Sequence, residues 1–394
     1  MREILVLAPQ ERDRKAIEAA GLADRYALRL VGSDLDGPAA PDPAGLLAEA
    51  ERLPADAVVG TKDASALLAA IAAESRGLPG PRPGAVLAIQ HKPTARSVER
   101  EAAPEATPRF AVLGSEPPFP FPFFVKPVVG RLSQNAFRID GEDDLRGLPE
   151  PGADVRRYEE IAGLAGGDPA AVTGFLAEEL LEGAEVSLEG YVHRGRVTVV
   201  GITDSVKYPG TLSFERFEYP SALPPERQAE IADVSARVLP AFGFDDGFFN
   251  VEFAVPDSGP ARIIEVNARI ASQFAPLLLG LHGRSSYDAL FQLALGEDPR
   301  WSVDPPDGVA ISYALRTFED AFVAAVPEPE PDPDLEILVR PGLQLSEQGV
   351  NDSQSYRLAI FTGFGETREE AVARVRERAA GLSFELAPVP APAP

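Results

Sequence analysis

Short apolar runs alternate with helical patterns along the first 90 residues. The apolar runs are EILVLA (3–8), YALRLVG (26–32), DAVVG (56–60) and AVLAIQ (85–90), and helical spacing lies near 10–20, 43–52 and 62–75. Strand, helix and strand at this spacing predict a parallel sheet with helices on its faces. The first turn, LAPQERD, lacks the G-x-G-x-x-G pattern of dinucleotide sites. We therefore expect an α/β domain at residues 1–90, without a predicted dinucleotide site.

From residue 91 onward the pattern predicts helices mixed with antiparallel strands. KPTARSVEREAA (92–103) predicts a helix, because proline is tolerated in the first helical turn. EGYVHRGRVTVVGI (189–202) predicts a β-hairpin, and two long strands are expected at GFFNVEFAV (247–255) and ARIIEVNARI (261–270). The stretch 141–173 is polar and rich in Gly, Pro and Asp, which is typical of mobile loops.

The last hundred residues predict a smaller α+β unit. Strands are expected at GVAISYALRTF (308–318) and YRLAIFTGF (356–364), separated by an acidic proline-rich linker at 326–334. A helix over TREEAVARVRERAA (367–380) is predicted by Thr367 at its N-cap and acidic residues in its first turn. The terminal APVPAPAP is expected to be a disordered tail.

Composition excludes several classes of function. The 61 acidic and 37 basic residues give a net charge of −24, which repels nucleic acid phosphates, so no nucleic acid partner is expected. The chain has no cysteine, which excludes disulfides, thiolate metal sites and cysteine nucleophiles. None of its 3 histidines has a second histidine at metal-ligand spacing. No apolar run approaches the roughly 18 residues of a membrane span, and the N-terminus does not resemble a signal peptide. We expect a soluble, cytoplasmic protein.

Lysine is rare in this chain, and that rarity suggests candidates. Only five of the 37 basic residues are lysines: Lys15, Lys62, Lys92, Lys126 and Lys207. Where arginine fills most cationic positions, a retained lysine indicates a need for a compact ammonium on a flexible stem. Lys92, Lys126 and Lys207 are the lysines that we select as functional candidates.

Two glutamates interrupt strands that otherwise have the composition of buried strands. The segment FNVEFAVPDSGPARIIEVNAR places Glu252 and Glu265 on neighbouring strands. Asn267 and Arg269 share the face of Glu265 by the period of two. Two carboxylates and an amide oxygen form a ligand set for Mg²⁺, and Arg269 would hold an anion beside the metal. The alternative is a pair of edge strands with solvated acids.

These motifs together resemble the ATP-grasp superfamily. In order along the chain they are Lys92 opening a helix, Lys126 ending a strand before a glycine loop, AEELLEGAE (177–185), Glu252, and Glu265-x-Asn267-x-Arg269. The resemblance covers about residues 80–300, and the segment NDSQSYRLAIFTGFGETREEAVARV resembles the C-terminal part of biotin carboxylase. It implies an α/β fold with an N-terminal Rossmann-like parallel sheet (1–90), an ATP-grasp α+β domain (91–300, lid about 115–180), a C-terminal α+β domain (301–386) and a tail (387–394).

The resemblance also implies a role for each motif residue toward ATP and Mg²⁺ (or Mn²⁺). Phosphate contacts are implied for Lys92, Lys126, Gly130, Ser133 and Gln134; adenine and ribose contacts for Glu178, the backbone from Glu179 to Leu181, and Glu185; and metal ligation for Glu252, Glu265 and Asn267. Arg269, Lys207 and Arg316 are the candidates for the transferring group and the substrate carboxylate. Taken alone, Lys126 also fits a strand-end surface lysine, Gly130 an ordinary turn, and Lys207 and Arg316 surface cations.

The reaction that the resemblance favours is ATP-dependent joining of a carboxylate to an amine through an acyl phosphate, releasing ADP and phosphate. The segments GITDSVKYPG (201–210) and FEYPSAL (217–223) resemble ATP-grasp amino-acid ligases, so amino-acid-like substrates and a dipeptide or small amide product are expected. A homodimer is expected from the family alone.

Two alternatives remain open at the sequence level. The first is a biotin-carboxylase-like enzyme; it is weakened because Gln273 stands where that family has a glutamate base, and because the single methionine cannot flank a biotinylated lysine. The second is a protein that binds ATP without turnover and regulates a partner. Retention of the whole metal and anion set speaks against it.

Overall fold

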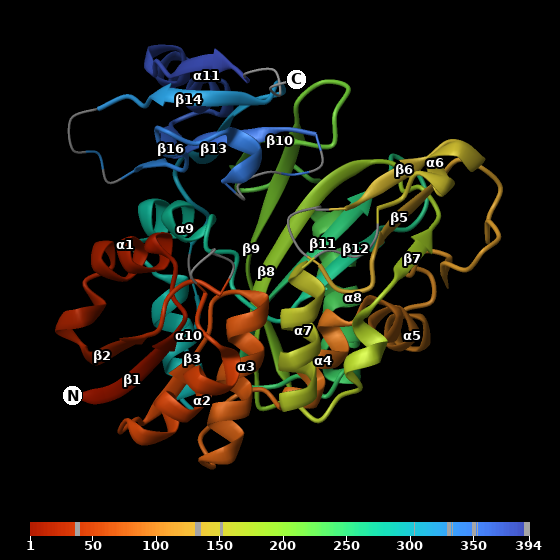
Figure 1. Cartoon of the computed structure of the whole chain (residues 1–394). Coiled ribbons are helices and arrows are strands. Elements are labelled where there is room, and N and C mark those ends of the chain that lie inside the picture. Colours follow the sequence, from red (N-terminus) through yellow and green to blue (C-terminus); the bar gives the residue numbers. More distant parts are fainter. Residues whose placement is uncertain are drawn as a thin grey trace.

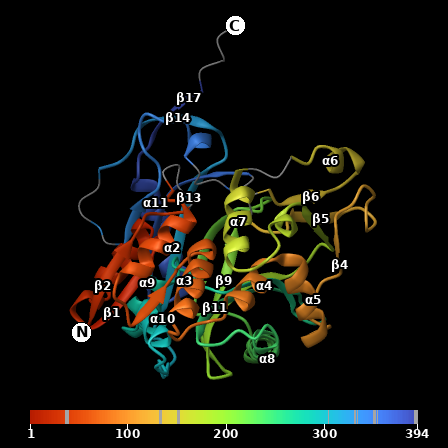
Figure 2. The same ribbon diagram turned by 60° about the horizontal axis from the view of Figure 1, so that its bottom comes forward.

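The computed structural model describes residues 1–35, 40–130, 135–149, 153–302, 304–328, 332, 334–348, 352 and 354–389. Three lobes surround a large central sheet: an N-terminal lobe, a small four-stranded sheet and a C-terminal lobe (Figure 1, Figure 2). The same two views place the chain's N-terminus on the N-terminal lobe. No helix among the described residues is long and apolar enough to cross a membrane.

The N-terminal lobe has the parallel sheet that the alternating pattern predicts. Its strand order is β2-β1-β3, with β1 (Arg2–Leu7), β2 (Tyr26–Val31) and β3 (Ala57–Val59) all parallel. Helices α1 (Glu11–Ala19), α2 (Pro43–Arg52), α3 (Asp63–Ser75) and the short 3-10 turn η1 (Leu22–Asp24) connect and flank the strands. Residues Ile4 to Leu7 have no solvent exposure, which explains the continuous apolar run of β1.

One apolar run of this region was interpreted wrongly from the sequence. Residues 85–90, which close the series of predicted strands, form most of helix α4 (Pro83–Gln90). Pro83 occupies the first helical turn, where its fixed φ favours a helix, and the run holds two alanines, a leucine and a glutamine, which have high helix propensity. A short buried run of this kind has the same hydrophobic pattern in a helix and in a strand.

The small sheet has the order β4-β7-β5-β6 and is antiparallel throughout. Its strands are β4 (Phe110–Val112), β5 (Phe123–Pro127), β6 (Phe137–Ile139) and β7 (Phe175–Glu178), and α5 (Lys92–Ala102) precedes them. Between β6 and β7 lie α6 (Glu142–Arg146), α7 (Ala153–Leu164) and η2 (Pro169–Val172). The prediction of loops over 141–173 was therefore wrong for most of that segment, because its Gly and Pro residues lie largely at helix ends.

The large sheet has eight strands in the order β12-β11-β8-β9-β10-β13-β16-β15, with antiparallel pairing between all neighbours. The strands are β8 (Ala184–His193), β9 (Arg196–Lys207), β10 (Phe214–Tyr219), β11 (Gly247–Val255), β12 (Arg262–Asn267), β13 (Val309–Thr317), β15 (Leu335–Ile337) and β16 (Tyr356–Gly365). This sheet continues across the domain boundary that we predict at residue 300, since β10 pairs with β13.

Helices cover both faces of the large sheet. Helix α8 (Pro225–Ala241) packs its apolar residues against one face of the sheet. On that face lie Val186 and Leu188 of β8 and Val251 of β11. The opposite face, represented by Tyr191 and Phe248, packs against α9 (Ala275–His282) and α10 (Ser286–Ala294), which in turn contact the N-terminal sheet. The N-terminal lobe and the large sheet therefore share continuous cores.

The C-terminal lobe ends in a two-stranded sheet. Strand β14 (Ala321–Ala325) pairs with β17 (Glu385–Pro388), while η3 (Leu345–Glu347) and α11 (Arg368–Gly381) complete the lobe. The predicted tail over 387–394 is wrong for its first two residues, because Ala387 pairs with Phe322 and Pro388 with Ala321. Residues 390–394 lie outside the described part of the chain.

Candidate active site

Two glutamates lie directly opposite each other on the face of the large sheet turned away from α8. Glu252 of β11 pairs with Glu265 of β12, and Asn250 pairs with Asn267 in the same register. The Asn267 amide Nδ2 lies 3.5 Å from Glu252 Oε1 and 3.4 Å from Asn250 Oδ1. The period of two along each strand brings two carboxylates and two amides together on one face.

The two glutamates have opposite electrostatic environments. Burial, together with the negative charge of Glu265, raises the pKa of Glu252 to about 8. Burial also favours the neutral form of Glu265, but the ammonium groups of Lys92 and Lys126 more than offset this and hold its pKa below the ordinary value. A cation bound between the two carboxylates would relieve the repulsion that Glu252 experiences.

The donor set fits a hard divalent cation. Carboxylate and amide oxygens are the ligands that Mg²⁺ prefers, with its remaining positions taken by water or phosphate. Among the described residues no group of three or more His, Cys, Asp or Glu side chains has a metal-binding arrangement. If a divalent cation binds at this place, its candidate protein ligands are Glu252, Glu265 and Asn267, the set that the resemblance implies.

Lys92 connects the start of α5 to the sheet face that carries Glu252 and Glu265, which we call the glutamate face. Its Nζ lies 2.9 Å from Glu265 Oε1 and donates to the Gly130 carbonyl at 3.1 Å, and its backbone N–H donates to the Val128 carbonyl at 2.9 Å. The structure thus brings together Lys92, Gly130 and Glu265, all selected from the sequence. The predicted loop residues Ser133 and Gln134 lie outside the described residues.

Lys126, at the end of β5, belongs to a buried ion-pair network. Its Nζ lies 2.9 Å from Glu178 Oε2 and donates to the Ile264 carbonyl at 3.1 Å. Glu178 Oε1 also accepts from Arg96 Nε at 2.6 Å. Burial raises the pKa of Glu178, but Arg96 and Lys126 overcome this effect and hold it at about 2. Glu178 is thus a permanent counter-ion for Lys126.

This network changes how Glu178 is interpreted. The resemblance implies a contact with the adenine amino group, whereas the structure directs both carboxylate oxygens toward Arg96 and Lys126. Arg96 was missed at the sequence level, although it follows Lys92 by four residues and so lies on the same face of α5. Its guanidinium also pairs with the buried Glu99 at 2.5 Å.

The chain between β7 and β8 contains the predicted adenine-binding segment. Glu179 Oε2 pairs with Arg109 Nε at 2.8 Å, its Oε1 contacts Arg262, and its N–H donates to the Arg109 carbonyl at 3.1 Å. The N–H of Leu181 has no hydrogen-bond partner among the described residues. Of the predicted backbone donors, Glu179 is therefore already paired, while Leu181 is available.

Glu185 and Lys207 form an ion pair, with Lys207 Nζ 2.5 Å from Glu185 Oε2. The Lys207 ammonium also lies 5.5 Å from the centre of the Phe214 ring. The sequence predictions assign these residues to opposite ends of a nucleotide, Glu185 to the ribose and Lys207 to the γ-phosphate. In this conformation the two side chains bind each other, and their roles toward a nucleotide stay predictions.

Arg269 links the metal-ligand candidates to the N-terminal lobe. Its Nη2 donates to Asn267 Oδ1 at 3.1 Å, and its Nε pairs with Asp63 Oδ1 at 3.1 Å. Asp63 is the first residue of α3 and was missed at the sequence level. Gly60, three residues before Asp63, has to be glycine, because a Cβ at this position would lie 2.0 Å from the Ser65 carbonyl oxygen.

Arg316 lies on β13, and its hydrogen-bond and ion-pair partners among the described residues do not belong to the cluster around Glu252 and Glu265. Its Nη1 lies 2.8 Å from Asp352 Oδ2 and also donates to Ser355 Oγ at 2.8 Å. Its Nε donates to the Phe214 carbonyl at 2.9 Å. Gln273 stands at the position of the carboxylase base. Its Nε2 donates to Oγ of Ser312, which lies on β13 like Arg316, at 3.0 Å. Arg316 therefore supports the junction of β10 and β13 through contacts within the chain.

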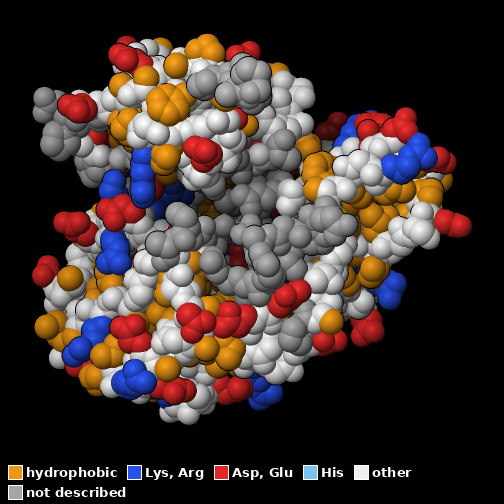
Figure 3. Space-filling model, in the orientation of Figure 1, with side chains coloured by type: hydrophobic (Ala, Val, Ile, Leu, Met, Phe, Trp, Pro, Cys, Tyr) orange, Lys and Arg blue, Asp and Glu red, His pale blue; other side chains and the backbone are white. Residues whose placement is uncertain are grey.

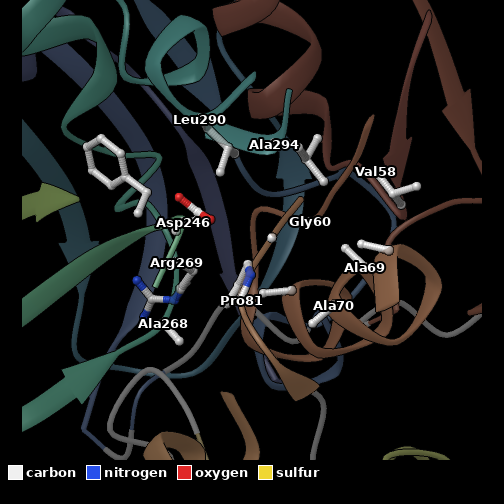
Figure 4. A pocket seen from close by; sticks show the side chains of 16 residues that line it. Val58, Gly60, Ala69, Ala70, Pro81, Asp246, Ala268, Arg269, Leu290 and Ala294 are labelled. Carbon is white, nitrogen blue, oxygen red and sulfur yellow. The ribbon is translucent and has the colours of Figure 1, made fainter. Parts of the chain in front are cut away.

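A small cavity beside Arg269 is not large enough for a substrate. Figure 4 shows it between Arg269 and Ala268 on one side and Gly60, Ala69 and Ala70 on the other. Its volume of about 40 Å³ leaves room for only a few water molecules. We therefore place the candidate site on the glutamate face of the sheet and not in this cavity.

Comparison with known proteins gives a consistent result. Residues 119–276 match the model of the ATP-grasp domain. Carnosine synthase 1 from Mus musculus is 29% identical over 133 residues, which are 33% of this chain and 16% of that protein. The human carnosine synthase 1 gives the same identity and coverage. The chain thus spans about a sixth of the length of these relatives.

Solved structures resemble nearly the whole chain. L-amino acid ligase from Bacillus licheniformis superposes with a TM-score of 0.77 at 18% identity, covering 98% of both chains. The biotin carboxylase domain of the 2-oxoglutarate carboxylase from Hydrogenobacter thermophilus superposes with a TM-score of 0.71 at 15% identity, covering 98% of this chain and 91% of that one. At such identities these matches establish the fold alone: a parallel N-terminal sheet, a large antiparallel sheet with helices and a smaller C-terminal unit.

Proposed function

We propose that this protein is an ATP-dependent carboxylate–amine ligase that forms an amide bond through an acyl phosphate and releases ADP and phosphate. The observation that carries the proposal is the register pair Glu252–Glu265, together with Asn267, Arg269 and Lys92 at its edges. Similarity to an L-amino acid ligase and to carnosine synthase 1 supports amino-acid-like substrates.

The nucleotide would lie between the small sheet and the glutamate face. Lys92 and Lys126, both buried, supply point charges for its phosphates, and the Leu181 backbone supplies a donor for the adenine edge. Mg²⁺ would be held by Glu252, Glu265 and Asn267, and when bound it supplies charge neutralisation for the phosphates. Lys92 and Lys126 now contact Glu265 and Glu178, so binding requires these lysines to share their charge with phosphate oxygens.

The chain's own residues would act by positioning and by charge. In the first step a carboxylate oxygen of the substrate attacks the γ-phosphorus, and ADP leaves. Arg269, fixed by Asp63 and adjacent to Asn267, would neutralise the charge on the transferring group. In the second step the amine nitrogen attacks the acyl carbon, phosphate leaves and the nitrogen loses a proton. No covalent nucleophile of the protein is needed.

The proposal is tested with Mg-ATP and a matrix of amino acids, other carboxylates, amines and bicarbonate. Phosphate release and product masses are recorded for the wild-type protein and for Glu265→Gln. Phosphate that requires a carboxylate together with an amine, an amide product of the summed mass less water, and loss of both in the variant would support the ligase.

The same matrix separates the two competing functions. Similarity to the biotin carboxylase domain favours including bicarbonate with biotin, and turnover that depends on this pair would replace the ligase by a carboxylase. Gln273 argues against that result, because an amide donating to Ser312 cannot accept a proton as a base. Saturable Mg-ATP binding without turnover on any combination would identify a non-catalytic nucleotide-binding protein.

A further inference from the structure

The junction of α4 and α5 connects several parts of the molecule through three consecutive side chains, those of Gln90, His91 and Lys92. Lys92 contacts Gly130 and Glu265 at the candidate phosphate site. The other two side chains reach the segment between β6 and β7, which contains α7 and η2. The junction therefore joins this segment to the place where the phosphates of a nucleotide would bind.

Gln90 uses both ends of its buried side-chain amide. Its Nε2 donates to the Asp63 carbonyl oxygen at 2.7 Å, and its Oε1 accepts from the Tyr158 hydroxyl. Asp63 is the first residue of α3, whereas Tyr158 lies in α7. Only 8% of Gln90 is exposed, and a buried amide needs partners for its donor and its acceptor. Gln90 thus bridges α7 and the N-terminal lobe.

Helix α7 is docked against the N-terminal lobe, and the two ribbon views show it beside α3 (Figure 1, Figure 2). Ile161 of α7 has no solvent exposure and belongs to the same apolar core as residues of α3 and α4. Tyr158 packs in a small apolar cluster with Val129, which follows β5. The following η2 is held as well, because His91 Nε2 lies 3.0 Å from the Ala171 carbonyl oxygen. Apolar and polar contacts together therefore fix the position of Tyr158.

The Tyr158 hydroxyl lies within electrostatic reach of the candidate active site. Burial raises the pKa of Tyr158 well above 10. The negative charges of Asp63 and Glu265 raise this pKa further, and the positive charge of Arg269 lowers it. The phenol therefore stays protonated at neutral pH and keeps donating its hydrogen bond to Gln90.

A continuous line of contacts leads from α7 to the metal-ligand candidates. Tyr158 donates to Gln90, and Gln90 donates to the main chain of Asp63. The carboxylate of the same Asp63 pairs with Arg269 at 3.1 Å, and Arg269 donates to Asn267 Oδ1 at 3.1 Å. Figure 3 shows exposed Lys and Arg side chains gathered where the N-terminal lobe faces the C-terminal lobe, on the side of α1. Arg269 differs from these cations, because only 20% of its side chain is exposed and partners within the chain orient it.

We propose that Tyr158 is a positioning residue for phosphoryl transfer, which acts through Gln90 and Asp63 on the guanidinium of Arg269. The inference rests on the proposed ligase function and adds a residue of α7 to its machinery. Tyr158 makes and breaks no bond of the substrate. Its hydroxyl holds the Gln90 amide in the orientation that donates to the Asp63 carbonyl, and this hydrogen bond fixes the start of α3. Without the hydroxyl, the Asp63 carboxylate is held less firmly against Arg269, and charge neutralisation in the transition state is weaker.

The test compares two tyrosines that each donate one hydrogen bond. Tyr158→Phe keeps the ring and removes the hydroxyl. Tyr26→Phe is the matched control, because the Tyr26 hydroxyl donates to Asp288 Oδ1 at 2.8 Å, between β2 and α10. Once a donor carboxylate is known from the substrate matrix, kcat and KM for ATP are measured for the wild type and both variants. Their melting temperatures report whether each variant is folded.

Tyr158→Phe is expected to lower kcat by about 3- to 10-fold, the range of one neutral hydrogen bond, while KM for ATP stays within about twofold. Tyr26→Phe should leave both kinetic constants unchanged. A double-mutant cycle with Asp63→Asn adds a readout that a merely structural role would not move. Because Asp63→Asn already removes the ion pair to Arg269, adding Tyr158→Phe to it should lower kcat by less than about twofold.

The outcomes distinguish this inference from the proposed function. Wild-type protein that releases no phosphate with any donor and amine would overturn the ligase function, and with it the role of Tyr158. Turnover by the wild type with an unchanged kcat in Tyr158→Phe would overturn the inference alone. So would an undiminished loss in the Asp63→Asn background, because Tyr158 would then act by another route. A raised KM for ATP at unchanged kcat, or an equal loss in Tyr26→Phe, would also overturn it, since the effect would then come from nucleotide binding or from stability.

Discussion

Glu252 and Glu265 face each other directly across the antiparallel pair β11–β12, with their carboxylates on the same side of the sheet. Burial and the negative charge of Glu265 raise the pKa of Glu252 to about 8, so at pH 7 the folded protein holds this carboxyl neutral while the unfolded chain ionises it, which costs stability. Glu252→Gln removes this cost and is therefore expected to raise the free energy of unfolding of the metal-free protein by at least about 1 kcal/mol. The same variant should lose the increase in melting temperature that Mg-ATP gives to the wild type.

Chemical denaturation without metal and thermal unfolding with and without Mg-ATP measure these two effects. Glu116→Gln is the control, since Glu116 is exposed in a loop. A Glu252→Gln protein that is less stable than the wild type, or that still responds to Mg-ATP, would contradict the assignment of Glu252 as a metal ligand.

Arg96 and Lys126 both form ion pairs with Glu178, but replacing each of them should have a different effect. Arg96→Met leaves the buried Glu99 and Glu178 without their main partner, and breaking a buried ion pair costs roughly 3–5 kcal/mol. Lys126→Met leaves Glu178 paired with Arg96, so most of its effect should be a weaker Mg-ATP affinity, by about tenfold or more. Denaturant unfolding and nucleotide titration of both variants test this division, which similar stability losses in the two would refute.

Asp63, in the N-terminal lobe, orients Arg269 through an ion pair, with Oδ1 of Asp63 3.1 Å from Nε of Arg269. Asp63→Asn removes the charge of that partner without removing Arg269, so the guanidinium keeps its hydrogen bonds to Asn267 Oδ1 and the Ile270 carbonyl but loses its ion pair. We expect kcat to fall about tenfold while KM for ATP stays within twofold, because small misplacements of a charge-neutralising group act on the transition state. Steady-state kinetics measure kcat and KM, and Asp257→Asn is the control because Asp257 is exposed. An unchanged kcat in Asp63→Asn would show that Asp63 has no role in catalysis.

Glu178 should make stability sensitive to acid. Its pKa is about 2 in the folded protein against an ordinary 4.5, so the folded state favours the ionised form. This stabilisation, of about 3 kcal/mol, is complete above pH 4.5 and is lost as the pH falls toward 2. Denaturant unfolding from pH 7 to pH 3.5 should show a gap between the wild type and Glu178→Gln that narrows below pH 4.5. A gap independent of pH would rule out this ionisation as its source.

Local patterns were sufficient for much of the fold and for the central pair of glutamates. The alternating apolar runs of residues 1–60 predicted the parallel sheet, and the period of two in β11 and β12 predicted which face holds Glu252, Glu265 and Asn267. In the same way the proline and glycine around Lys126 predicted the end of β5. Each of these inferences needs only neighbours in the sequence, where strand and turn geometry are decisive.

The remaining features depend on contacts between distant segments. Arg96 reaches Glu178 across 82 positions, and Arg269 reaches Asp63 across 206, so neither partner can be predicted from spacing. Tyr158 was not selected, because its contact with Gln90 spans 68 positions and depends on how α7 packs. The helix at 83–90 was missed because a short buried run carries no period.

Transfer of an oxygen atom tests the central claim most directly. The donor carboxylate, labelled with ¹⁸O in both oxygens, is incubated with Mg-ATP, an amine acceptor and the wild-type protein, and the released phosphate is analysed by mass. A ligase acting through an acyl phosphate places one ¹⁸O atom in each phosphate, and Glu265→Gln releases none. Unlabelled phosphate, or label found in AMP, would contradict the mechanism.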